Sequence, residues 1–158
     1  MNAVDTNVLI YRPDRREPIK QAQARELLRK LADDSEPTLV PWQVLGELAN
    51  QLRRWQDQHW LTREASHRYL AAFRSLFPTA MPTPAVLDHA LDFAERYSLS
   101  HWDSMLLGAC IEAKVDTLYT ARQTHTKSLS GQGLATGRCR SKRPCVAAWR
   151  YFLCLGVV

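Results

Sequence analysis

The chain has 158 residues, 46% of them hydrophobic, which is ordinary for one globular domain that folds without disulfides or a structural metal. It has no apolar run near the ~20 residues of a membrane span and no signal-peptide pattern at its start, so we expect a cytoplasmic protein. The net charge of +5 is unevenly spread: residues 1–120 contain 14 Lys/Arg and all 16 Asp/Glu, whereas residues 121–158 contain 7 Lys/Arg and no acid. This shift indicates a boundary near residue 120.

The first predicted element is a short buried strand that ends at Asp5. A turn there leads directly into a helix. Val, Ile and Tyr in residues 4–11 favour a strand, whereas Asp5 and Asn7 favour a turn. Because ligands of open parallel sheets bind beyond the carboxyl ends of the strands, Asp5 would lie at a ligand-binding edge. The alternative is that Asp5 or Asn7 only caps the helix that follows.

Apolar periodicity predicts the other elements in chain order. Ala24, Leu27, Leu28 and Leu31, for example, recur at the spacing of one helical face. Helices are expected at about 18–32, 43–55, 62–77, 84–97 and 100–113, and strands at 38–41, 80–81 and 116–120. This alternation predicts an α/β fold in which helices cover both faces of a parallel sheet, joined by right-handed crossovers.

Three acids lie at the edges of apolar segments: Asp5, Glu47 and Asp103. In the predicted sheet, the strand end with Asp5 and the helix starts with Glu47 and Asp103 share one rim. Converging carboxylates repel one another and raise each other's pKa, so a fold tolerates them best when a cation neutralises them. Mg²⁺ prefers such oxygens, and it can activate a water and stabilise charge on a phosphodiester.

Each acid also has a simpler interpretation. Asp103 stands three residues after Ser100, as in a capping box. Glu47 resembles a solvated helix residue with Arg54 nearby. Asp116 reads as a turn residue, and because a strand rises ~3.3 Å per residue, it would lie more than about 10 Å from the functional end of its strand.

Four motifs, in this order and spacing, resemble the PIN-domain ribonucleases, and in particular the VapC-type toxins of toxin–antitoxin pairs. They are Val4-Asp5-Thr6-Asn7-Val8-Leu9, Val44-Leu45-Gly46-Glu47-Leu48, Ser100-His101-Trp102-Asp103-Ser104-Met105-Leu106 and Asp116-Thr117-Leu118-Tyr119-Thr120. For residues 1–120 the resemblance implies a three-layer α/β/α sandwich and an endoribonuclease that depends on Mg²⁺ or Mn²⁺. It also implies a homodimer, inhibited by an antitoxin that inserts a segment into the acidic groove.

The resemblance also implies roles for individual residues. Asp5, Glu47 and Asp103 become catalytic metal ligands, and Thr6 and Asn7 orient Asp5 or the bound water. The family pattern continues after the last strand with a further acid, but here Thr120 is followed by Ala121 and Arg122. We therefore expect a nuclease impaired by loss of its fourth acid; the alternative is a non-catalytic PIN-like module that dimerises or binds antitoxin.

Residues 121–158 form an atypical, irregular basic tail. Charge, cysteine content and periodicity all change where the family pattern ends, which favours a shift of reading frame near residue 120; the other two frames of the gene would decide this. The alternative is a basic RNA-binding arm built on Arg138, Arg140, Lys142 and Arg143. A nucleotide-binding domain is disfavoured, because residues 1–120 contain only two glycines and no phosphate-binding loop.

Overall fold

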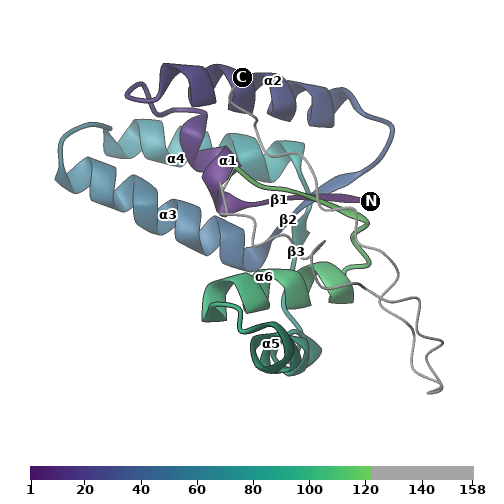
Figure 1. Ribbon diagram of the computed structural model, residues 1–158. Helices are drawn as coiled ribbons and strands as arrows, with labels where there is room; N and C mark the ends of the chain where they lie inside the picture. The colour runs from purple at the N-terminus through teal and green to yellow at the C-terminus, as the bar shows by residue number, and fades with distance from the viewer. Residues whose placement is uncertain (122–158) are drawn as a thin grey trace, which may run out of the picture.

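The computed structural model describes residues 1–121, and the expectations about residues 122–158 lie outside this range. The described chain alternates strands and helices (Figure 1). The elements are β1 (Asn2–Val4), α1 (Thr6–Tyr11), α2 (Pro18–Asp33), β2 (Thr38–Pro41), α3 (Trp42–Asp57), α4 (Arg63–Leu76), β3 (Thr79–Ala80), α5 (Pro84–Tyr97), α6 (His101–Glu112) and β4 (Thr117–Tyr119). None of the helices within residues 1–121 is long and apolar enough to cross a membrane.

The four strands form one parallel sheet in the order β3-β2-β1-β4. β1 lies in the middle, with Asn2 paired to Thr38 of β2 and Val4 paired to Tyr119 of β4. In Figure 1, α2 lies at the top, α5 and α6 lie at the bottom, and the strands run between them. The expected three-layer α/β/α sandwich with a parallel sheet is therefore confirmed.

The helix expected directly after Asp5 is α1, and it is a unit separate from α2. The predicted helix at 18–32 corresponds to α2. α1 is only six residues long, too short to be stable by intrinsic propensity. Its Val8 and Leu9 are completely buried, so packing rather than local preference holds this apolar segment in a helix.

The core fixes the rotation of α3, which matters for the site. Its buried residues are Val44, Leu45, Leu48, Leu52 and Trp55. They recur at helical spacing and form one buried face, with Leu48 wholly excluded from solvent. Because Glu47 directly precedes Leu48, this packing holds Glu47 at the edge of the apolar face.

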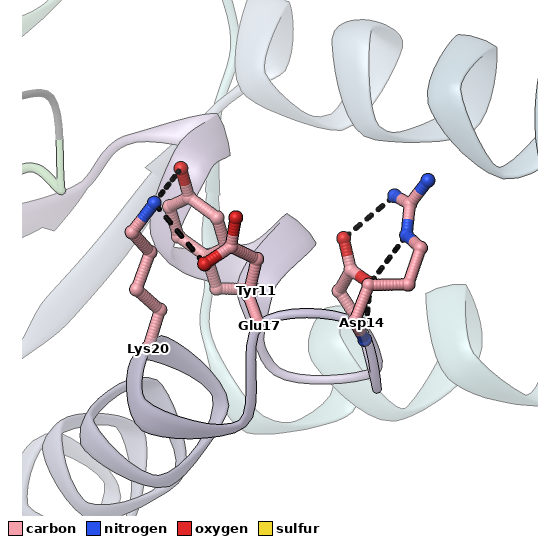
Figure 2. A network of polar contacts seen from close by, with 5 residues as sticks. Tyr11, Asp14, Glu17 and Lys20 are labelled. Atoms are coloured by element: carbon pink, nitrogen blue, oxygen red, sulfur yellow. Dashed lines mark hydrogen bonds and ion pairs between the residues drawn. The ribbon is translucent and has the colours of Figure 1, made fainter.

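The turn between α1 and α2 is organised by Asp14, which is buried (Figure 2). Its Oδ1 accepts hydrogen bonds from the backbone N–H (3.0 Å) and Nε (2.8 Å) of Arg16, and its Oδ2 accepts one from Nη2 (2.7 Å). The guanidinium lies 4.2 Å from the ring centroid of Trp60. Beside this pair, Lys20 reaches the Tyr11 hydroxyl at 3.5 Å. Arg16 thus joins the loop to the segment that follows α3, and Lys20 joins α2 to α1.

We expect the Asp14–Arg16 pair to make stability depend on pH. The hydrogen bonds from Arg16 hold the pKa of Asp14 below its usual value. A lowered pKa stabilises the fold fully above the unfolded-state pKa of about 3.9, and this contribution is lost as the pH falls through the folded-state pKa. Asp14→Asn should therefore lower Tm at pH 7, and thermal melts should show the difference from the parent shrinking below about pH 4.

Asp92→Asn is the matched control, because Asp92 pairs with Arg96 across one turn of α5 and both side chains are 61% exposed. An exposed pair of this kind contributes little to stability, so its melts should follow those of the parent at every pH. A loss of Tm in Asp14→Asn that stayed the same from pH 7 to pH 3 would contradict the assignment.

Candidate functional site

Asp5 lies directly after β1, and its backbone N–H donates to the carbonyl of Tyr119 at 2.8 Å. The side chain is buried, and the residue is only 6% exposed. Although Asp5 occupies the N-cap position of α1, its carboxylate accepts no hydrogen bond from the helix backbone, and Asn7 lies inside the helix. The capping interpretation of these two residues is therefore wrong.

The Asp5 carboxylate is instead held by side chains. Its Oδ2 accepts hydrogen bonds from Asn7 Nδ2 at 3.1 Å and from Thr120 Oγ1 at 2.7 Å. Asn7 thus contacts Asp5, the acid that the resemblance assigns to it. Both hydrogen bonds end on Oδ2, so neither of them occupies an acceptor position of Oδ1.

Glu47 is held by two elements. Its Oε2 accepts a hydrogen bond from Thr6 Oγ1 at 2.8 Å, and its Oε1 accepts one from Gln43 Nε2 at 2.8 Å. Thr6 therefore contacts Glu47 rather than Asp5. The interpretation of Glu47 as a solvated helix residue with Arg54 and Arg53 nearby is wrong, because the carboxylate is partly buried and bonded to α1 and to its own helix.

Asp103 lies in the first turn of α6. Ser100 caps this helix by accepting a hydrogen bond from the Asp103 N–H at 3.2 Å, and its hydroxyl donates to Asp103 Oδ2 at 2.7 Å. The expected N-cap at Ser100 is confirmed, and the serine hydroxyl is a partner of the Asp103 carboxylate. The hydrogen bond to Oδ2 does not prevent Asp103 from binding a metal ion, because an ionised carboxylate has about four acceptor positions.

Hydrogen bonds link the chain segments that carry the three acids. Thr6, directly after Asp5, bonds Glu47. Gln43 bonds both Glu47 and the carbonyl of Trp102, which directly precedes Asp103. Within residues 1–121, however, no three Asp, Glu, His or Cys side chains come close enough together to hold a metal ion as they stand.

Asp116 lies apart from this rim, as expected. Its backbone N–H donates to the carbonyl of Met1 at 2.8 Å, at the edge of the sheet where β1 and β4 begin. Its side chain is 81% exposed. Asp5 and Thr120 lie at the opposite end of these two strands, directly after the last residues of β1 and β4.

Cys110 of α6 is completely buried. Burial raises its pKa to about 12, and the negative charge of Asp5 adds to this effect. The thiol therefore stays protonated at neutral pH and serves as an apolar neighbour of the acidic rim, not as a nucleophile.

Two partners of the acids were not predicted from the sequence, Gln43 and Thr120. Gln43 stands four residues before Glu47, which places both on one helix face. Thr120 directly follows β4, at the sheet edge where Asp5 follows β1. These spacings could have indicated Gln43 and Thr120 as partners of the acids. They do so only after Glu47 and Asp5 have been assigned to a functional site.

The sequence profile of the family described as PIN domain matches residues 3–121. The chain belongs to the PIN domain family. Its fold is similar to that of VapC20 from Mycobacterium tuberculosis, a toxin that cleaves the sarcin-ricin loop. The TM-score is 0.59 at 18% identity over 84% of this chain and 95% of that one.

A second solved structure with the same PIN-domain fold is VapBC2 from Rickettsia felis, bound to a DNA fragment from its promoter. The TM-score is 0.59 at 16% identity, over 77% of this chain and 86% of that one. No curated protein sequence matches this chain. At these identities the likeness to the two solved structures shows a shared fold, so the chemistry has to be argued from the residues of this PIN domain.

Proposed function

We propose that this PIN domain is a toxin-type endoribonuclease that hydrolyses RNA phosphodiesters with a bound Mg²⁺ or Mn²⁺. Asp5, Glu47 and Asp103 are the proposed catalytic metal ligands. The observation that carries the proposal is that Glu47 bonds Thr6, the residue after Asp5, and Gln43, which also bonds the carbonyl of Trp102, the residue before Asp103. The rim where β1 ends matches the ligand-binding edge of parallel α/β sheets.

The residues present fit a hard divalent cation. Carboxylate oxygens are its preferred ligands, and Mg²⁺ keeps several waters, so one or two direct carboxylates can hold it. Asp5 is buried, and its two partners, Asn7 and Thr120, both bond Oδ2. When bound, the cation would activate a water and neutralise charge on the scissile phosphate.

The chain's own residues have separate tasks in this proposal. Asn7 and Thr120 fix the plane of the Asp5 carboxylate, and Thr6 fixes that of Glu47. These partners act through the acids and are positioning residues. Buried Cys110 and its apolar neighbours exclude water beneath the rim, which strengthens the electrostatic interactions there.

Two exposed indoles support RNA as the substrate. Trp42 begins α3 and is 52% exposed, and Trp102 near the start of α6 is 57% exposed. The hydrogen bond from Gln43 to the Trp102 carbonyl, 3.0 Å long, holds these two helix starts together. Exposed aromatic rings stack on the bases of single-stranded nucleic acids with little sequence preference.

We propose further that the protein forms a homodimer and binds a cognate antitoxin. The R. felis neighbour belongs to a VapBC complex, which supports a partner of this class. On α5, Leu87 and Leu91 are exposed one turn apart and offer apolar surface for an interface. Co-expression with the product of the neighbouring gene, followed by light scattering, tests both associations.

The missing fourth acid favours a second candidate function, an inert PIN module that still dimerises or binds antitoxin. Ala121 and Arg122 stand where the family pattern has its acidic turn, and a cation at this position opposes the binding of Mg²⁺. If loss of the acid impairs an otherwise intact nuclease, Ala121→Glu combined with Arg122→Asp should raise kcat/KM at limiting Mg²⁺ by at least about tenfold.

The measurement is RNA cleavage by parent and restored chains, with and without Mg²⁺. Arg74→Asp, on the exposed side of α4, is a control for the change of charge and should cleave like the parent. Equal cleavage by parent and restored chains would contradict the impairment. Absence of Mg²⁺-dependent cleavage in both chains would instead favour the inert module.

A further inference from the structure

We propose that Gln43 is a positioning residue that fixes Glu47 and the start of α6 for cation binding. This inference rests on the proposed metal-dependent function. Gln43 lies in the first turn of α3, one turn before Glu47. Its amide bonds Glu47 on the same helix and the backbone carbonyl of Trp102 in α6.

Both hydrogens of the Gln43 amide are used. Nε2 lies 2.8 Å from Glu47 Oε1 and 3.0 Å from the Trp102 carbonyl oxygen. Both partners are acceptors, so the opposite orientation of the amide would bring Oε1 against two oxygens. The orientation of the side chain is therefore determined by its neighbours.

The Glu47 carboxylate is restrained at both oxygens. Gln43 bonds Oε1, and Thr6 bonds Oε2 at 2.8 Å. A carboxylate offers about four acceptor positions, so two remain for a cation or its waters. The two donors therefore orient the carboxylate without exhausting it, as outer partners of metal ligands do.

The other end of the amide lacks a donor. Gln43 Oε1 is buried and has no hydrogen-bond partner among residues 1–121. A buried carbonyl oxygen without a donor is costly, and structures normally provide one. A water held by the hydrated cation would be such a donor. Gln43 would then accept a hydrogen bond from that water at Oε1 and donate one to Glu47 from Nε2.

The contact with Trp102 extends the effect to Asp103. Because Asp103 follows Trp102, a shift at the start of α6 moves this acid together with the backbone. Removing the amide eliminates its hydrogen bond to Glu47 and its hydrogen bond to the Trp102 carbonyl, which links α3 to α6. Loss of such outer partners typically weakens metal binding about 10–100-fold.

The test uses Gln43→Met, which keeps the length of the side chain but donates no hydrogen bond. Calorimetric titration of the metal-free full chain with Mn²⁺ should give an affinity about 10–100-fold below that of the parent. Amide hydrogen exchange at residues 101–105 should accelerate without metal. RNA cleavage should require more Mn²⁺ for half-saturation, while kcat largely recovers at saturating Mn²⁺.

Gln51→Met is the matched control, two turns further along α3, and should titrate like the parent. Gln43→Ala serves as a second variant if the methionine side chain disturbs packing. Parent-like Mn²⁺ affinity in a folded Gln43 variant would overturn this inference alone, even if exchange at residues 101–105 accelerated. Absence of Mn²⁺ binding to the parent would overturn the proposed function together with it.

Discussion

Asp5→Asn is expected to lower kcat/KM for RNA cleavage by about a thousandfold, equivalent to about 4 kcal/mol of transition-state stabilisation. The substitution removes the charge that holds the cation while keeping the shape of the side chain. The carbonyl oxygen of the new amide can still accept the hydrogen bonds from Asn7 and Thr120. We therefore expect Tm to change little and the loss to appear in Mn²⁺ binding and in cleavage.

Asp116→Asn provides the control for this substitution. It makes the same chemical change at the opposite edge of the sheet, where the side chain is 81% exposed. Its cleavage rate should equal that of the parent. Full activity of Asp5→Asn would refute the proposed site, and an equal loss in both variants would show that the effect is not local to the rim.

Gly108→Ala is expected to destabilise the fold by about 2–3 kcal/mol, near the upper end of the range for overpacking. A Cβ atom at this position of α6 would lie 2.5 Å from the carbonyl oxygen of Val86 and 3.3 Å from the backbone nitrogen of Ala90. Both atoms belong to the backbone of α5, so α5 and α6 would have to separate. Chemical denaturation with urea measures the loss.

Gly46→Ala is the matched comparison, because an added Cβ at Gly46 of α3 meets no atom within 4 Å. Alanine in a helix interior is favoured over glycine by about 0.5–1 kcal/mol, so this variant should be slightly more stable than the parent. Destabilisation of both variants to the same extent would show that close approach of α5 and α6 is not the cause.

The sequence predicted most of the fold because its apolar periodicities are regular. The buried stripe of α3 and the cap of α6 at Ser100 both agree with the sequence-based expectation. A helix was also expected directly after Asp5, but the six residues of α1 are too few to show a helical period from which its end could be predicted. Burial of Val8 and Leu9 stabilises this short helix.

The candidate site could be predicted only in part. The acids stand at recognisable edges of apolar segments, so Asp5, Glu47 and Asp103 can be selected from the sequence. Their partners depend on tertiary contacts: Thr120 bonds Asp5 across 115 residues, and Thr6 bonds Glu47 across 41. Spacing along the chain cannot show which hydroxyl reaches which carboxylate.

The most direct test of the central claim is a crystal structure of the protein with Mn²⁺ and its anomalous scattering. We predict a peak within coordination distance of carboxylate oxygens of the rim, about 2.1 Å as for Mg²⁺, with Asp5 and at least one of Glu47 and Asp103 among the ligands. A Mn²⁺ peak that contacts none of the three acids, in crystals that bind the ion elsewhere, would contradict the claim.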